Sequence, residues 1–172
     1  MRLRPALIRT APVAVALAAA AVTLAPTPAQ AAAPECKTTK REPPLPNKPD
    51  VDLKVRICVR LDQASSGYRW YEAYVDRVDW DGTSFYTGGK RFNSLRIKVR
   101  LEHNNDSKDS ATENVTSDVN GSEADYRKAF ADKASVRTRS KQWTADGVIS
   151  FDAANDGRGT QTRQLTGTKS VT

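Results

Sequence analysis

The chain has little of the chemistry on which most enzymes depend. It contains one histidine, His103, and two cysteines, Cys36 and Cys58, among 172 residues. No serine or cysteine lies in a recognisable nucleophile motif, and no cysteine or histidine spacing matches a metal site. These absences argue against hydrolase and metal chemistry. We therefore expect a protein that is not an enzyme and that uses no cofactor and no metal.

Long apolar runs are also missing once the first 31 residues are set aside. Three arginines precede an apolar run over residues 11–24, which leads to a small-x-small site at residues 29–31. This pattern predicts a secretory signal peptide over residues 1–31. No later stretch approaches the roughly 18 apolar residues that a membrane helix needs. We therefore expect a secreted, extracellular product with no membrane anchor.

A strong net charge is missing as well. The formal charge of the whole chain is +7, and it falls to +4 without the three arginines of the predicted leader. A charge of this size suits ordinary solubility and gives little support for a polyanionic partner. No DNA-binding or RNA-binding signature occurs in the chain, so nucleic acid is not an expected partner.

The two cysteines predict a single disulfide. Their number is even, and the predicted export places them in an oxidising compartment. A bond between Cys36 and Cys58 would close a loop that the chain-entropy treatment rates at about 3 kcal/mol. It would fasten the new N-terminus to the first strand.

Residues 32–51 differ in composition from everything that follows. They contain five prolines among lysine, threonine and glutamate, and proline fixes φ and removes a backbone donor. We expect an extended and irregular N-terminal arm. Two interpretations remain open for it: a solvated tail held by the disulfide, or a docking peptide for a partner's groove.

Three segments with strand character open the predicted domain over residues 52–172. Residues 53–61 and 92–102 alternate strictly between apolar and polar side chains, which is typical of strands with one buried face. Residues 68–80 are rich in aromatic side chains but change parity, so we predict a β-bulge near Asp76 and Arg77. Turns are expected at residues 65–67, 81–82 and 88–89.

The second half of the chain is less regular. Residues 103–123 are polar and predict a long exposed loop or weak strands, and residues 122–134 fit either a helix or a short edge strand. Further elements are expected in this order: a polar strand over 136–143, a turn at Asp146–Gly147, a strand over 148–152, a turn over 155–159 and a final strand over 160–167. Together these elements predict an all-β protein, an antiparallel β-sandwich of about 6–8 strands.

Basic side chains occupy the polar positions of the two regular strands. Like charges that lie directly opposite each other destabilise a pair of neighbouring strands. We therefore expect that these two strands are not neighbours and that they flank the acidic strand 68–80 in a meander. A charge-balanced solvated face is one interpretation. The other is a basic platform for an acidic partner, with Tyr74 and Trp70 exposed. The candidate residues of this basic and aromatic face are Lys54, Arg56, Arg60, Tyr74, Arg96, Lys98 and Arg100.

Several of these segments together resemble small secreted proteins of actinomycetes. The resemblance is in residues 58–61, 68–81 and 92–102, and in the closing segments 143–147 and 164–167. It implies a secreted β fold and no particular activity. More broadly, a secreted one-disulfide β domain with an extended N-terminal peptide resembles the adaptor subunit of umbrella toxin particles. That likeness implies a protein-linking role.

Three functions follow in order of preference. The first is a secreted non-catalytic protein-binding or adaptor module, whose partner is another secreted or cell-surface protein. The second is a binder of cell-surface or anionic polymers through the basic strand face. The third is a secreted inhibitor or enzyme, because two carboxylates that are distant in sequence can meet in space.

Overall fold

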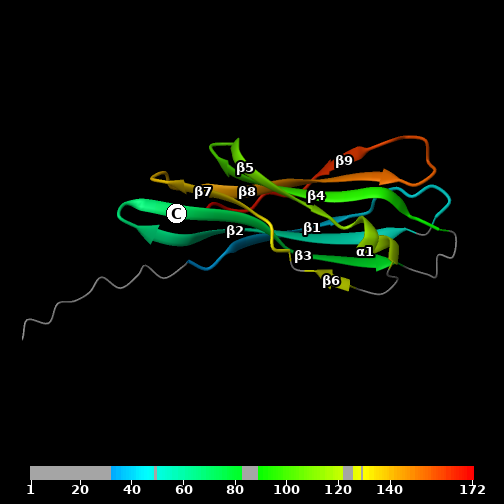
Figure 1. Cartoon of the computed structure of the whole chain (residues 1–172), viewed down its shortest axis with the longest axis horizontal. Coiled ribbons are helices and arrows are strands. Elements are labelled where there is room, and N and C mark those ends of the chain that lie inside the picture. The colour runs from blue at the N-terminus through cyan, green and yellow to red at the C-terminus, as the bar shows by residue number, and fades with distance from the viewer. Residues whose placement is uncertain (1–31, 49, 83–88, 122–125, 129) are drawn as a thin grey trace, which may run out of the picture.

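Two antiparallel sheets face each other across one apolar core (Figure 1). The structure is a computed structural model, and it describes residues 32–48, 50–82, 89–121, 126–128 and 130–172. The predicted signal peptide over residues 1–31 lies outside the described residues. The prediction of an all-β antiparallel sandwich is confirmed, as is the disulfide between Cys36 and Cys58.

The first sheet has the strand order β1-β2-β3, and both β6 and β7 pair with the far edge of β3. Its strands are β1 (Glu35–Arg41), β2 (Val51–Ser65), β3 (Tyr68–Gly82), β6 (Tyr126–Lys128) and β7 (Lys133–Thr138). The long hairpin of β2 and β3 forms the centre of this sheet. This hairpin turns at Ser66 and Gly67, whose φ angles of 51° and 80° lie in the left-handed region that a tight hairpin turn requires.

The second sheet has the strand order β5-β4-β8-β9. Its strands are β4 (Phe92–His103), β5 (Asp106–Asn114), β8 (Trp143–Ala153) and β9 (Gln161–Gln164). The short helix α1 (Thr116–Gly121) follows β5 and covers one end of the sandwich. In Figure 1, the turn of the β2–β3 hairpin and the helix α1 lie at opposite ends of the molecule.

Strict alternation along the long strands builds the core. The inward side chains of β2, β4 and β8 are almost all fully buried, and the outward ones are partly or fully exposed except for the disulfide-bonded Cys58. Because successive side chains of a strand point to opposite faces, a period of two is what one buried face produces. The largest fully buried side chains are Trp80, Tyr71, Phe92 and Phe151.

The predicted bulge is confirmed at Asp76. Arg56 pairs with Arg77 and Ile57 with Val75, so Asp76 is the extra residue on β3. This extra residue shifts the alternation by one position. As a result, Val75 and Val78 both point into the core although they differ in parity.

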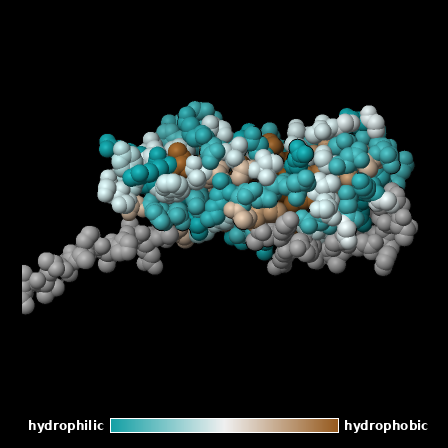
Figure 2. Space-filling model, viewed as in Figure 1, coloured by the Kyte–Doolittle hydropathy of each residue, from teal (hydrophilic) through white to brown (hydrophobic). Residues whose placement is uncertain are grey.

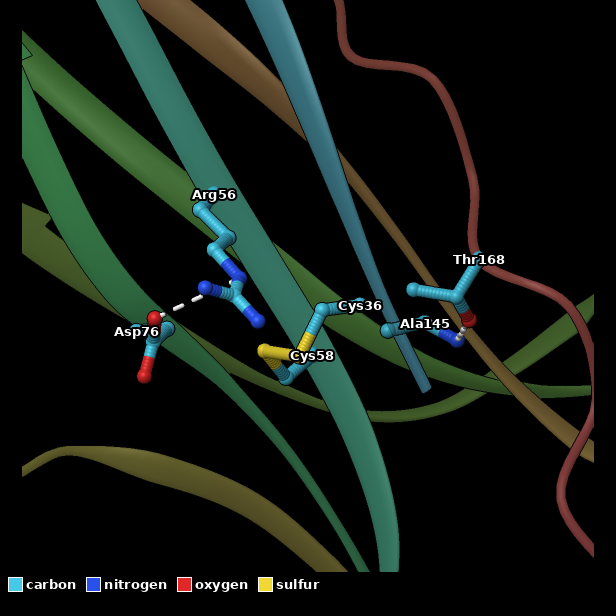
Figure 3. Close-up of a disulfide and its surroundings, with 6 residues drawn as sticks. All are labelled: Cys36, Arg56, Cys58, Asp76, Ala145 and Thr168. Carbon is cyan, nitrogen blue, oxygen red and sulfur yellow. Dashed lines mark hydrogen bonds and ion pairs between the residues drawn. A yellow bond between two sulfur atoms is a disulfide. The ribbon is translucent and has the colours of Figure 1, made fainter. Parts of the chain in front are cut away.

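The N-terminal arm is more ordered than predicted. Its first part is the edge strand β1, which pairs with β2 so that Cys36 lies directly opposite Cys58, with 4.1 Å between their Cα atoms (Figure 3). The irregular part of the described arm is residues 32–34, 42–48 and 50. Even there, Pro43 and Leu45 are buried, and the Lys48 ammonium donates to the backbone carbonyls of Arg91 and Ala154.

The predicted turn at Asp146–Gly147 is wrong, because β8 runs through it without interruption. Glycine is needed there for a different reason. A Cβ atom on Gly147 would lie 2.6 Å from the carbonyl oxygen of Lys98 on the neighbouring strand β4. The residue therefore permits close approach of two backbones, which is the other common role of a strand glycine.

Other predicted elements of the second half are also corrected. Of the two alternatives for residues 122–134, the helix does not form over the described part and the short strand does, because this part contains β6 and the start of β7. Residues 122–125 and 129 lie outside the described residues. The polar strand ends at Thr138, and Trp143 begins β8. Residues 103–123 contain the exposed strand β5 and the helix α1, and the last strand is only Gln161–Gln164.

Side chains join the two sheets along both lateral edges. On one edge, the Arg41 guanidinium donates to the carbonyl oxygen of Gln164 at 2.6 and 3.2 Å, and the Thr166 N–H donates to the Thr39 hydroxyl at 2.9 Å. On the other edge, the Ser135 N–H donates to Asp109 at 2.7 Å. These bonds cover the sheet edges with polar contacts to the protein itself.

Candidate functional site

The structure divides the candidate basic face into two groups. The candidate residues on β2 and β3 lie on the outer face of the first sheet, and the candidate residues on β4 lie on the outer face of the second sheet. The two strands are not neighbours, as predicted, but the meander is wrong because β4 belongs to the other sheet. The outer faces of a sandwich point in opposite directions, so no single platform exists. The first group is Lys54, Arg56, Arg60 and Tyr74, and the second is Arg96, Lys98 and Arg100.

Acidic neighbours pair with three of these arginines. Arg56 lies 3.5 Å from Asp76, the bulge residue, as Figure 3 shows. Arg60 lies 2.7 Å from Glu72 and 3.1 Å from Asp62. On the other sheet, Arg100 contacts Glu102 at 3.2 Å and Asp146 at 2.8 Å. These parts of both outer faces are charge-balanced.

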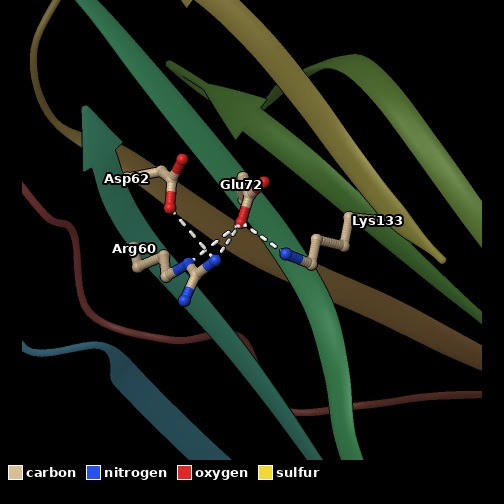
Figure 4. A network of polar contacts seen from close by, with 4 residues as sticks. All are labelled: Arg60, Asp62, Glu72 and Lys133. Atoms are coloured by element: carbon tan, nitrogen blue, oxygen red, sulfur yellow. Dashed lines mark hydrogen bonds and ion pairs between the residues drawn. The ribbon is translucent and has the colours of Figure 1, made fainter. Parts of the chain in front are cut away.

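The most connected carboxylate is Glu72 (Figure 4). Its Oε2 accepts hydrogen bonds from Arg60 Nε at 2.9 Å, from Arg60 NH2 at 2.7 Å and from Lys133 Nζ at 3.0 Å. Burial alone would raise the pKa of Glu72, but the bonds from Lys133 and Arg60 outweigh it and hold this pKa below its ordinary value. The network joins β2, β3 and β7 and stabilises the sheet.

Tyr74 is half-buried rather than exposed. The Arg60 guanidinium lies 5.5 Å from the centre of its ring, and burial raises the pKa of its hydroxyl. Tyr74 therefore packs on the outer face beside the Glu72 network.

The exposed aromatic residue is Trp70, near the turn of the β2–β3 hairpin. It is 39% exposed, and it is the one large hydrophobic side chain that is exposed in the described part of the chain. It borders a depression of about 270 Å³ lined by Gln63, Ser65, Tyr68, Arg69, Trp70 and Arg137. The surface in Figure 2 is mostly hydrophilic, with only small hydrophobic areas. An exposed tryptophan beside a depression differs from this background.

Arginines lie around the aromatic side chains of Tyr68 and Trp70. Arg137 lies directly opposite Trp70 in the ladder between β3 and β7. The guanidinium groups of Arg137 and Arg139 lie 4.8 and 4.7 Å from the centre of the Tyr68 ring, within cation–π range. Over the described residues, no carboxylate lies within ion-pair distance of Arg69, Arg137 or Arg139. We call Tyr68, Arg69, Trp70, Arg137 and Arg139 the hairpin-end site.

The side chains of the hairpin-end site are suited to binding an acidic ligand. Guanidinium groups can bind a carboxylate in bidentate fashion, and the indole offers an apolar face beside them.

Among the described residues, no group of three or more histidine, cysteine or acidic side chains could hold a metal. His103 packs on Trp143 with 5.0 Å between the ring centres. The described part of the chain also contains no helix that is long and apolar enough to span a bilayer.

Sequence reasoning found Trp70 but missed its neighbours. Tyr68 and Trp70 share one parity on β3, and Arg137 near the end of β7 shares its parity with Arg139, which follows the strand. These two alternations were the signal in the sequence from which the members of the site could have been recognised. Only the register between β3 and β7 shows that they meet, and sequence patterns do not give that register.

Comparison of the chain with protein-family models, curated proteins and solved structures gives no match. The resemblance to secreted actinomycete proteins and to the umbrella-particle adaptor therefore stays a prediction.

Proposed function

We propose that the protein is a secreted, non-catalytic binding module whose hairpin-end site takes an acidic segment of another secreted or cell-surface protein. The observation that supports this most is the exposed Trp70 bordered by arginines that have no carboxylate partner within the described residues. Tryptophan, tyrosine and arginine are the residue types that dominate binding energy at protein interfaces.

The charge of the site favours an acidic partner. Arg137 and Arg139 lie against the Tyr68 ring, where an arriving carboxylate could bind them without breaking an existing ion pair. Pairs that form at such a surface raise the association rate and select partners of opposite charge. The paired strands β3 and β7 hold four of these residues and keep the arrangement rigid, which reduces the entropy lost on binding.

The N-terminal arm is a weaker candidate for the contact. Its residues 35–41 already form β1, and Leu45 is buried against the body of the protein. Within this segment, only the outer edge of β1 and its exposed side chains remain accessible to a partner. Deleting residues 32–50 would also remove the disulfide, so loss of binding in that variant would not identify the binding surface.

Affinity capture from culture supernatant tests the proposal. The tagged mature protein should retain a stoichiometric protein partner, and Trp70→Ala should weaken its binding at least about thirtyfold, as expected for a central aromatic residue. Arg137→Gln should weaken binding less and reduce its dependence on salt. The control Arg158→Gln removes an exposed arginine from the turn after β8 and should bind normally.

A partner that binds Trp70→Ala as tightly as the wild type would contradict the hairpin-end site. Equal loss in Arg137→Gln and Arg158→Gln would show that only overall charge matters. Circular dichroism of each variant shows that the β fold is retained.

A further inference from the structure

A second depression lies on the other sheet, at the end of the sandwich opposite the hairpin-end site. Its volume is about 380 Å³, and it is bordered by the start of β4, the end of β5 and α1. Apart from the buried Phe92, its lining is polar. The residues that give it its chemistry are Lys90, Asn93, Ser94, Arg96, Asn114 and Ser117. We call these six residues the β4 depression.

Hydrogen bonds fix the walls of this depression. The Asn120 side chain accepts from the N–H groups of Arg91 and Phe92 at 2.9 and 3.0 Å, and it donates to the Phe92 carbonyl at 2.8 Å. The Thr116 hydroxyl accepts from the Leu95 N–H at 2.7 Å. The helix is thereby fastened to β4, and the depression is preformed.

One amide is oriented by this scaffold. Asn114 Oδ1 accepts from the backbone N–H of Thr116 at 3.1 Å and from its hydroxyl at 2.6 Å. The Asn114 Nδ2 group is left as a donor at the rim, with no acceptor among the described residues. Asn114 lies directly opposite Arg96 in the ladder, so an amide donor and a guanidinium lie side by side.

The cations here differ from the paired arginines elsewhere on both sheets. Arg96 and Lys98 are exposed on the outer face of β4, and neither has a carboxylate within ion-pair distance in the described part of the chain. Their cross-strand neighbours are Asn114 and Ser150 for Arg96, and Thr112 and Val148 for Lys98. Asp152 on β8 lies opposite Ser94 and accepts from the Asn93 amide at 3.3 Å.

The hydroxyl and amide groups around Arg96, with Lys98 further along the same strand, suit one ligand chemistry. A sugar or polyol supplies hydroxyl groups for the asparagine and serine side chains, and a phosphate or carboxylate on it supplies the charge that Arg96 can bind. The lining contains no exposed aromatic ring on which a neutral sugar could stack. We propose that the β4 depression binds an anionic unit of a carbohydrate or polyol polymer, whose chain continues along β4 past Lys98.

This site is independent of the hairpin-end site. The two lie on opposite sheets and at opposite ends of the sandwich, so a polymer and a protein could bind at the same time. The module would then link a protein to an anionic polymer.

Binding to defined polymers tests the inference. The probes are poly(glycerol phosphate), polygalacturonate and neutral dextran, each measured by biolayer interferometry with the mature protein at low salt. At least one anionic polymer should bind and dextran should not, and the preferred one distinguishes phosphate from carboxylate. The double variant Arg96→Gln with Lys98→Gln should lose at least about tenfold in affinity, since hydrogen bonds to charged groups are the stronger class.

The matched control removes two exposed lysines from the first sheet, Lys37→Gln with Lys54→Gln. It has the same net charge as the test variant and should bind like the wild type. Equal weakening in both double variants would overturn the inference, as would equal binding of dextran or no binding of either anionic polymer. Trp70→Ala should leave polymer binding unchanged, which separates this result from the proposed protein partner.

Discussion

The charge on Glu72 should stabilise the fold, and the substitution Glu72→Gln measures how much. The Glu72 side chain is only 12% exposed, and one of its oxygens accepts three hydrogen bonds from the cations of Arg60 and Lys133. Glutamine keeps the size and an acceptor oxygen but removes the charge. Hydrogen bonds to charged groups contribute about 1.5–3 kcal/mol and neutral ones about 1 kcal/mol. Because Arg60 and Lys133 are each about one-third exposed, we expect a net loss of about 1–2 kcal/mol at neutral pH.

The direction of the pKa shift of Glu72 determines how its contribution to stability changes with pH. The pKa of Glu72 is lowered in the folded protein from its ordinary value of 4.5. A carboxyl group with a lowered folded pKa stabilises the fold above its unfolded pKa, and this contribution is lost as the pH falls through the folded value. The difference in unfolding free energy between the wild type and Glu72→Gln should therefore be complete at neutral pH and shrink below pH 4.5.

Urea denaturation followed by tryptophan fluorescence measures this difference across the pH range. Glu102→Gln is the informative control, because burial raises the pKa of Glu102 above 4.5 although Arg100 opposes the shift. Ionised Glu102 therefore costs stability as the pH rises, and its replacement should be neutral or stabilising at neutral pH. A loss for Glu72→Gln that is the same at every pH, or no loss at all, would refute the role given to its charge.

Two further changes test the scaffold by denaturation. Replacing Cys36 and Cys58 by alanine should cost about 3 kcal/mol, because the disulfide closes a loop over a separation of 22 residues; a urea midpoint equal to that of the oxidised protein would contradict this. Gly147→Ala should lower the calorimetric unfolding temperature by the equivalent of about 1–3 kcal/mol, since its Cβ would meet the Lys98 carbonyl. The control Gly121→Ala has open space around the new methyl group and should be nearly neutral, so equal effects at the two glycines would exclude the steric explanation.

Local patterns predicted the parts of the fold that depend on one strand at a time. The alternation in 53–61 and 92–102 gave β2 and β4 and their buried faces. The change of parity in 68–80 gave the bulge at Asp76, and the two cysteines gave the disulfide. Each of these is a property of neighbouring residues or of a unique pair.

Properties that depend on pairing between distant strands were not predictable in this way. Alternation shows which side chains of β4 face the core, but it does not show which sheet β4 joins. The strand β1 is an edge strand without an apolar alternation, so its proline neighbours suggested an irregular arm instead. Gly147 was interpreted as a turn because the carbonyl of Lys98 that approaches it belongs to another strand. The hairpin-end site was incomplete for the same reason, since it needs the register of β7 on β3.

The bonds between Arg41 or Thr39 and the segment 164–166 connect positions 123 and 127 residues apart. Contacts this distant in sequence form late, because a long loop must be ordered before they contribute any stability. Arg41 and Thr39 find these partners only after the segment 164–166 has been ordered beside β1. We expect this edge between β1 and β9 to be the last part of the sandwich to close during refolding.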